Sequence, residues 1–220
     1  MALNKLKFNS LNVTPTAGKT IGFNSSADGL EATFSGGAMT FIKKLTASSS
    51  STLSFVNGSS DVVLDSTYKE YLFIFNNIHP QTDDVSFMFN LSIDGGSNYN
   101  VTKTSTFFIA FQNEAGSQTN LIYSGNYDNA QSTGNEYLTT DTLGADNDQC
   151  VSGYLHLFNP SSTTFVKHFI AQVSHYHEAD FAVNDFKSGY ANTTSAIDAI
   201  QFKMDSGNID AGDICLYGIN

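Results

Sequence analysis

The sequence predicts an all-β fold, a jelly-roll-type β-sandwich with an extended N-terminal arm. From residue 39 onward, apolar segments of roughly five to twelve residues alternate with turn-forming Gly, Asn, Asp, Ser and Pro. No ten-residue segment has its apolar positions at helical spacing. Aromatic residues make up 13% of the 220 residues, with 18 Phe and no Trp, which is enough to fill a core between two sheets.

Residues 1–38 differ in composition from residues 39–220, and we expect the arm to end where the sandwich begins. Within 1–38, single apolar residues stand apart in polar sequence, too sparsely to bury a core. Isolated apolar residues on an extended chain suit docking on a partner. A disordered leader and an edge strand of the same domain are the alternatives. The expected partner-binding residues of the arm are Leu6, Phe8, Leu11, Val13, Ile21 and Phe23.

The first strands of the sandwich are predicted in four segments. Residues 39–45 (MTFIKKL) and 52–56 (TLSFV) are short apolar runs separated by serines. Residues 69–78 (KEYLFIFNNI) are almost continuously apolar, which predicts a strand covered on both faces. Residues 85–93 alternate apolar and polar side chains, with Ile93 on the apolar face, which predicts a half-buried strand.

The later strands follow the same punctuation. Residues 112–149 are rich in Asn, Gly, Asp, Gln and Thr and predict loops with two short strands, at 121–123 and 137–138. Longer strands are expected at 105–111, 150–158, 163–176, 180–191, 197–204 and 211–219. The absence of a short sequence repeat argues against a propeller or a solenoid.

The end of the chain carries a turn signal. Ser206-Gly207-Asn208 lies between two apolar segments, and Gly207 or Asn208 can take a positive φ. We therefore expect a closing hairpin, with Ile214, Leu216 and Gly218 on one face of its second strand.

Charge excludes several partner classes. The net charge is −11, and the ten basic residues are all Lys. Contacts to phosphate need basic patches, so we expect neither nucleic acid nor an anionic membrane as a partner. No segment approaches the roughly 18 apolar residues of a membrane span, and the N-terminus lacks the apolar run of a secretory signal.

Residue chemistry predicts no enzyme and no cofactor. There is no Gly-x-Ser-x-Gly elbow and no glycine-rich phosphate cradle. His175 and His177 would share one face of a strand and could bind a metal, but inter-subunit or surface histidines are the simpler interpretation. Asp141 to Asp148 offers oxygen ligands for calcium, against an ordinary solvated loop. Cys150 and Cys215 are expected as buried thiols, with a disulfide as the alternative.

Four tyrosines in the predicted loops are candidates for sugar contact. Aromatic rings offer flat apolar faces to sugars, and Tyr can serve where Trp is absent. Ordinary loop packing is the alternative interpretation. The candidates are Tyr99, Tyr123, Tyr127 and Tyr137.

Residues 197–220 (IDAIQFKMDSGNIDAGDICLYGIN) resemble the C-terminus of a group of tailed-bacteriophage virion proteins from aquatic viruses. Residues 42–87 and 157–169 resemble the same group, so the resemblance covers most of 39–220. It implies a jelly-roll-like virion protein of the head-decoration or tail-fibre type, and no catalytic residue is carried over from it. The matching positions are Ile197, Ile200, Phe202, Ser206, Gly207, Asn208, Ile209, Gly212, Ile214, Leu216, Tyr217, Gly218 and Ile219.

Three functions follow as hypotheses. The first is a capsid decoration (cement) protein that binds the outside of the head through its N-terminal arm. The second is a short trimeric tail fibre or receptor-binding protein that contacts host surface glycans. A glycan depolymerase is the weakest, because the chain has few Glu and no repeats. We expect a homo-oligomer, with a trimer as its form, bound to the major capsid protein or a tail protein.

Overall fold

The computed structural model of the chain describes residues 20–23, 26, 29–33, 38–140 and 142–220. The described residues form fourteen strands and no helix, which confirms the all-β prediction. The chain divides into two units between Thr40 and Phe41, two residues beyond the boundary expected at residue 38.

The described part of the first unit holds a short antiparallel hairpin of β1 (Thr20–Phe23) and β2 (Leu30–Thr33), in which Phe23 pairs with Leu30. The interpretation as an extended arm did not include this hairpin. Both predicted binding residues on β1 are exposed, Ile21 at 38% and Phe23 at 74%. The other predicted arm residues, Leu6, Phe8, Leu11 and Val13, lie outside the described residues.

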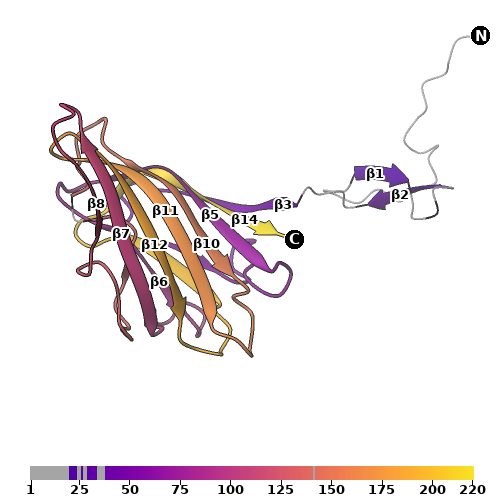
Figure 1. The fold of residues 1–220 in the computed structure, drawn as a ribbon. Helices are drawn as coiled ribbons and strands as arrows, with labels where there is room; N and C mark the ends of the chain where they lie inside the picture. Colours follow the sequence, from indigo (N-terminus) through magenta and orange to yellow (C-terminus); the bar gives the residue numbers. More distant parts are fainter. Residues whose placement is uncertain (1–19, 24–25, 27–28, 34–37, 141) are drawn as a thin grey trace, which may run out of the picture. The chain divides into compact units, whose positions relative to one another are not determined.

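The second unit is a sandwich of two antiparallel sheets, as predicted. Its topology is consistent with a jelly roll. The larger sheet contains eight strands, in the spatial order β3 (Met39–Thr46), β14 (Ile209–Ile219), β5 (Glu70–Pro80), β10 (Val151–Phe158), β11 (Lys167–His177), β12 (Phe181–Ala191), β7 (Lys103–Asn113) and β8 (Thr119–Tyr123). The long strands β7, β12, β11 and β10 run side by side in this sheet (Figure 1). The smaller sheet contains β4 (Leu53–Val56), β13 (Ala199–Met204), β6 (Phe87–Ser92) and β9 (Glu136–Tyr137).

Phenylalanine rings fill the space between the sheets. Phe202, fully buried on β13, lies at the centre of this cluster. Edge-to-face and offset contacts of this kind add to the free energy gained by burying the rings. The rings that surround Phe202, with centroids 5.3 to 6.4 Å away, belong to Phe55, Phe73, Phe75, Phe87 and Phe89.

Two burial predictions were wrong, and in opposite directions. β5, expected to be covered on both faces, leaves Leu72 and Ile74 half-buried on its outer side. β6, expected to be half-buried, is buried along its whole length. Asn90 on β6 donates its side-chain amide to Thr133 O and Asn135 Oδ1, at 3.1 and 3.2 Å, so a distant loop covers that face. Ile93, placed on the apolar face, is 43% exposed just after the strand ends.

The predicted closing hairpin is also wrong, although its turn is present. Gly207 has a φ of +70°, as the turn requires. However, β13 pairs with β4 and β6, whereas β14 pairs with β5 and borders β3, so the turn carries the chain from one sheet to the other. The expected face of β14 is confirmed, because Ile214, Leu216 and Gly218 are buried.

Candidate interaction surface

The larger sheet has one face against the core and one face turned away from it. Along β11 the side chains alternate regularly between buried and accessible positions. We call the outward side chains of β10, β11, β12, β7 and β8 the outer face. They are Ser152, Tyr154, His156, Phe158, His168, Ile170, Gln172, Ser174, Tyr176, Ala182, Asn184, Phe186, Ser188, Tyr190, Thr104, Thr106, Phe108, Ala110, Gln112, Thr119, Leu121 and Tyr123.

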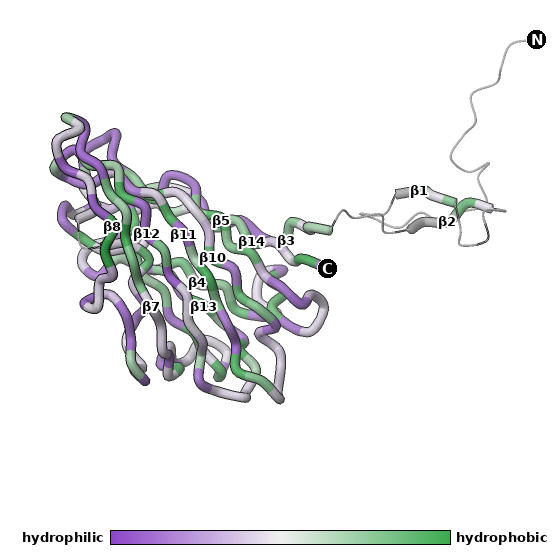
Figure 2. Tube along the Cα trace, in the orientation of Figure 1, coloured by the Kyte–Doolittle hydropathy of each residue, from purple (hydrophilic) through white to green (hydrophobic). Residues whose placement is uncertain are grey.

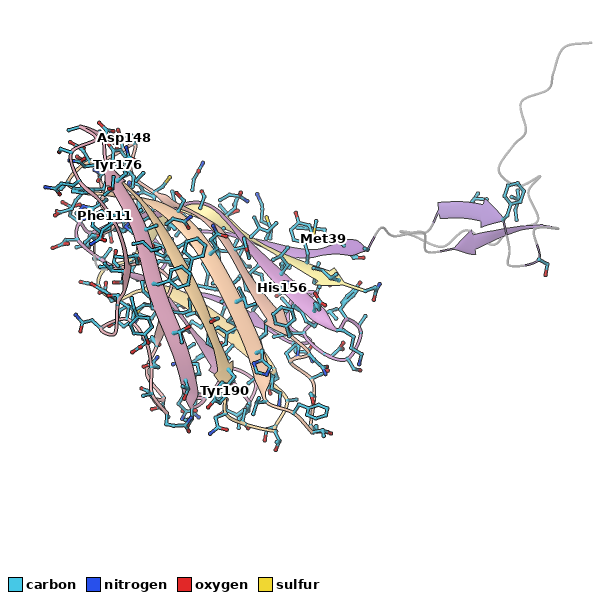
Figure 3. All side chains as sticks on the ribbon, in the orientation of Figure 1. Met39, Phe111, Asp148, His156, Tyr176 and Tyr190 are labelled. Atoms are coloured by element: carbon cyan, nitrogen blue, oxygen red, sulfur yellow. The ribbon has the colours of Figure 1, made fainter. Side chains whose placement is uncertain are left out.

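None of the outer-face residues is Asp, Glu or Lys, although the chain has 21 acidic and ten basic residues. Rings and aliphatic side chains lie among hydroxyl and amide groups, and Ile170 is 47% exposed. Figure 3 shows His156 on β10 and Tyr190 on β12 within this face. Depletion of charge together with enrichment in Tyr and Phe is typical of the centres of protein interfaces.

Aromatic side chains line up across the outer face because the strand registers bring them together. Phe186 and Phe108, paired between β12 and β7, stack with centroids 4.7 Å apart and planes 6° from parallel. Tyr123, at the edge, is 61% exposed. The whole row, read from β5 to β8, is Ile74, Tyr154, Gln172, Phe186, Phe108 and Tyr123.

The outer face contains shallow hollows. One, of about 400 Å³, lies beside Gly189 and is bordered by Thr104, His168 and Tyr190. A second, of about 590 Å³, lies beside Tyr176. The Tyr176 hydroxyl donates to Glu114 Oε1 or Asp180 Oδ1, at 3.0 and 3.1 Å, and these carboxylates raise the pKa of Tyr176 above its usual range.

Charged side chains of these strands lie instead in the interior. Lys187 on β12 contacts Glu136 on β9 with Nζ and Oε2 2.7 Å apart, and both side chains are almost fully buried. Lys187 Nζ also donates to Tyr127 O at 2.7 Å, and Ser105 donates to Glu136 Oε2 at 2.8 Å. Burial lowers the pKa of Lys187. The cluster fastens the loop between β8 and β9 to the inner side of the larger sheet.

Lys103 on β7 extends the interior cluster toward β6. Its Nζ donates to Asn90 Oδ1 at 2.7 Å and to Val101 O at 2.6 Å. Burial lowers the pKa of Lys103 to about 8, opposed by the attraction of Glu136. These interior charges were not recognised in the sequence. Their signal was that β7 and β12 carry charges on one face only, a face that would ordinarily be assigned to solvent.

The two histidines of the His-x-His pattern each have other hydrogen-bonding partners. His175 is buried, with Nδ1 2.7 Å from Asp185 Oδ2 and Nε2 3.2 Å from Thr142 Oγ1. Burial raises the pKa of Asp185, and the hydrogen bond with His175 opposes that rise. His177 Nδ1 accepts the Ala179 N–H at 2.9 Å. Across the described ranges, no three His, Cys, Asp or Glu side chains gather as a metal would require.

The loop of residues 141–148, a candidate for calcium binding, is held by hydrogen bonds in the structure. Asp141 lies outside the described residues. Asp146 N–H donates to Gln149 Oε1 at 3.1 Å, and Ala145 N–H donates to Asp83 Oδ1 at 2.8 Å. Side chain and backbone thus hold this loop closed on itself and on the loop after β5.

The structure brings only some of the predicted sugar-contact tyrosines together. Tyr127 and Tyr137 pack edge to face, with centroids 5.3 Å apart. Tyr127 also packs on Phe107, at 5.5 Å. Tyr123 lies on β8, where its hydroxyl bonds to Asp128, and Tyr99 packs against Gly96 in the loop after β6. Sugar contact by these residues stays a prediction.

Cys150 and Cys215 are free thiols, as expected, but they are half-buried where buried thiols were predicted. Their partial burial raises the pKa of both thiols. No disulfide joins the described strands.

No protein-family model, curated protein or solved structure matches this chain. Among the residues that the structure describes, no helix is long and apolar enough to cross a lipid bilayer.

Proposed function

We propose that this protein is a structural component of a phage virion, a capsid decoration protein that binds the outside of the head through residues 1–38. The proposal rests on the sequence resemblance given above, because neither the fold nor the surface is specific to virions. A decoration protein works by adhering to the capsid, and this role requires neither an active site nor a cofactor.

The observation that supports an adhesive role is the uncharged outer face. In a protein of net charge −11, the outward side chains of five neighbouring strands include no Asp, Glu or Lys, and the carboxylates of Glu70 and Glu114 lie at the border of this face. Such a surface can be buried against a neighbour without leaving a charge unpaired. In a shell of many copies, modest contacts of this kind add up through multivalency.

The arm can be tested by deletion. Full-length protein is expected to cosediment with purified capsids, and a variant lacking residues 2–38 is expected to remain in the supernatant. Circular dichroism should show that the truncated protein keeps the β-sheet signal of the sandwich, because the sandwich strands begin at Met39. Full retention of the truncated protein on capsids would contradict the proposal.

A short tail fibre or receptor-binding protein is the second candidate. The outer face favours it in one respect, since hydroxyls, amides and rings are groups that bind neutral glycans. Purified protein would then block host adsorption and bind host surface glycans. Gold-labelled antibody on the tail would support this candidate, whereas labelling of the head would support decoration.

A further inference from the structure

β8 is an open edge of the larger sheet. It is the last strand in the sheet order, and all five of its residues, TNLIY, are exposed. Figure 2 shows β8 at the border of the sheet, with strongly hydrophobic residues in part of its length. Leu121 is 66% exposed and Tyr123 is 61% exposed. An exposed apolar edge strand is a ready template for pairing with another chain.

The backbone of β8 has hydrogen-bonding groups directed away from the sheet. Asn113 N–H donates to Gln118 O at 3.0 Å and Ser124 N–H donates to Phe107 O at 2.9 Å, on either side of β8. In an antiparallel pair the bonded positions alternate, so the backbone groups of Thr119, Leu121 and Tyr123 point outward. Leu121 N–H donates a hydrogen bond to the side-chain Oδ1 of the neighbouring Asn120 at 2.9 Å. A strand that pairs with β8 can replace this local bond.

The other sheet edges in the described part of the sandwich are protected. β3, at the opposite edge of the larger sheet, carries Lys43 and Lys44, and lysine is a common guard of edge strands. In the smaller sheet, β9 has only two residues, and β4 has four residues that alternate between buried and half-buried. β8 alone among these edges combines length, exposure and lack of charge.

We propose that β8 pairs antiparallel with β8 of a second copy of this chain, about a two-fold axis at Leu121. This register sets Leu121 opposite its own symmetry mate and Thr119 opposite the partner's Tyr123, with no like charges facing each other. Asp128, the carboxylate that contacts the strand, accepts the hydrogen bond of the Tyr123 hydroxyl.

Where two copies of this chain meet, charge favours this place over the rest of the surface. Two chains of net charge −11 repel each other through most of their surfaces, and an uncharged edge beside an uncharged outer face reduces that repulsion. The contact is isologous and forms a dimer, which differs from the trimer expected in the sequence analysis. The proposal does not depend on a virion role.

The assembly state tests the proposal. Sedimentation velocity of the full-length protein is expected to show a monomer–dimer equilibrium. Leu121→Lys is expected to be monomeric at the same concentrations, because it places a charge opposite its own copy. Phe165→Lys, at a residue 69% exposed in the loop between β10 and β11, is the matched control and is expected to dimerise like wild type. Unchanged melting temperatures would show that both variants fold.

Wild-type protein that stays monomeric up to about 1 mM would overturn the proposal, as would an oligomer that Leu121→Lys leaves intact.

Crosslinking tests the register independently. In a Cys150→Ser/Cys215→Ser background, Leu121→Cys is expected to form a covalent dimer on mild oxidation, because facing residues of an antiparallel pair lie about 5.5 Å apart at Cα. Ile170→Cys, exposed on β11, is expected to stay monomeric under the same conditions. Equal crosslinking of the two variants would overturn the register at Leu121.

Discussion

Lys103 occupies an interior position that usually belongs to an apolar side chain. Its side chain is fully buried, and two oxygen atoms, Asn90 Oδ1 and Val101 O, accept hydrogen bonds from its ammonium group. Burying an ammonium group costs free energy that such bonds only partly offset. The lowered pKa of Lys103, about 8, reflects that cost.

This pKa predicts a pH dependence of stability. Below about pH 8 both the folded and the unfolded chain carry the Lys103 proton, whereas between about pH 8 and pH 10 only the unfolded chain keeps it. The free energy of unfolding of wild type should therefore rise over this range relative to Lys103→Met, by about 2 kcal/mol. Urea unfolding at several pH values measures the difference. The exposed Lys69→Met is the control, and parallel curves for wild type and Lys103→Met would contradict the prediction.

A second residue-scale prediction concerns the core. Phe202→Ala removes the ring that five other rings surround, and it should lower the free energy of unfolding by about 3–5 kcal/mol. Chemical denaturation measures this loss. Phe165→Ala, at an exposed residue, should change the same quantity by less than about 0.5 kcal/mol.

At the scale of strands, the sequence predicted positions well and faces poorly. Apolar runs bounded by turn residues placed β10, β12 and β14 within two residues of their observed ends. In β12, however, Asp185 and Lys187 point inward while Phe186 points outward. Alternation alone cannot tell which face meets the core. The inward charges depend on Glu136 and His175, which come from distant parts of the chain.

The Lys187–Glu136 contact predicts how the loop before β9 is held. Glu136→Leu leaves the Lys187 ammonium buried without its carboxylate and should lower the free energy of unfolding by about 3–5 kcal/mol. Hydrogen exchange should quicken at the loop amides that bond to β7, Ser132 among them. The double variant Glu136→Leu/Lys187→Met should recover part of the loss. Lys44→Ala, which breaks the exposed pair with Asp213, should cost less than about 1 kcal/mol.

At the scale of the whole molecule, composition alone predicted a division into residues 1–38 and residues 39–220, because the first 38 residues have fewer apolar side chains than the rest. The buried apolar residues of the described chain run from Ala47 to Leu216, all within the second unit. Removing residues 2–38 should therefore leave the melting temperature of the sandwich unchanged, as calorimetry would measure. A lowered melting temperature would mean that the first unit contributes to the core. The outer face could not be predicted from the sequence, because its composition depends on the pairing and register of five strands.

The two lysines on β3, Lys43 and Lys44, bear on how many copies of the chain could assemble through their sheet edges. If the β3 edge also lacked charge, each copy could pair through β8 with one neighbour and through β3 with another. Repeated pairing of this kind would build a fibre. In the proposed dimer, Lys43 and Lys44 make the β3 edge of each copy a poor site for a second pairing of this kind. These two residues would thereby oppose the growth of fibres through the edges of the larger sheet.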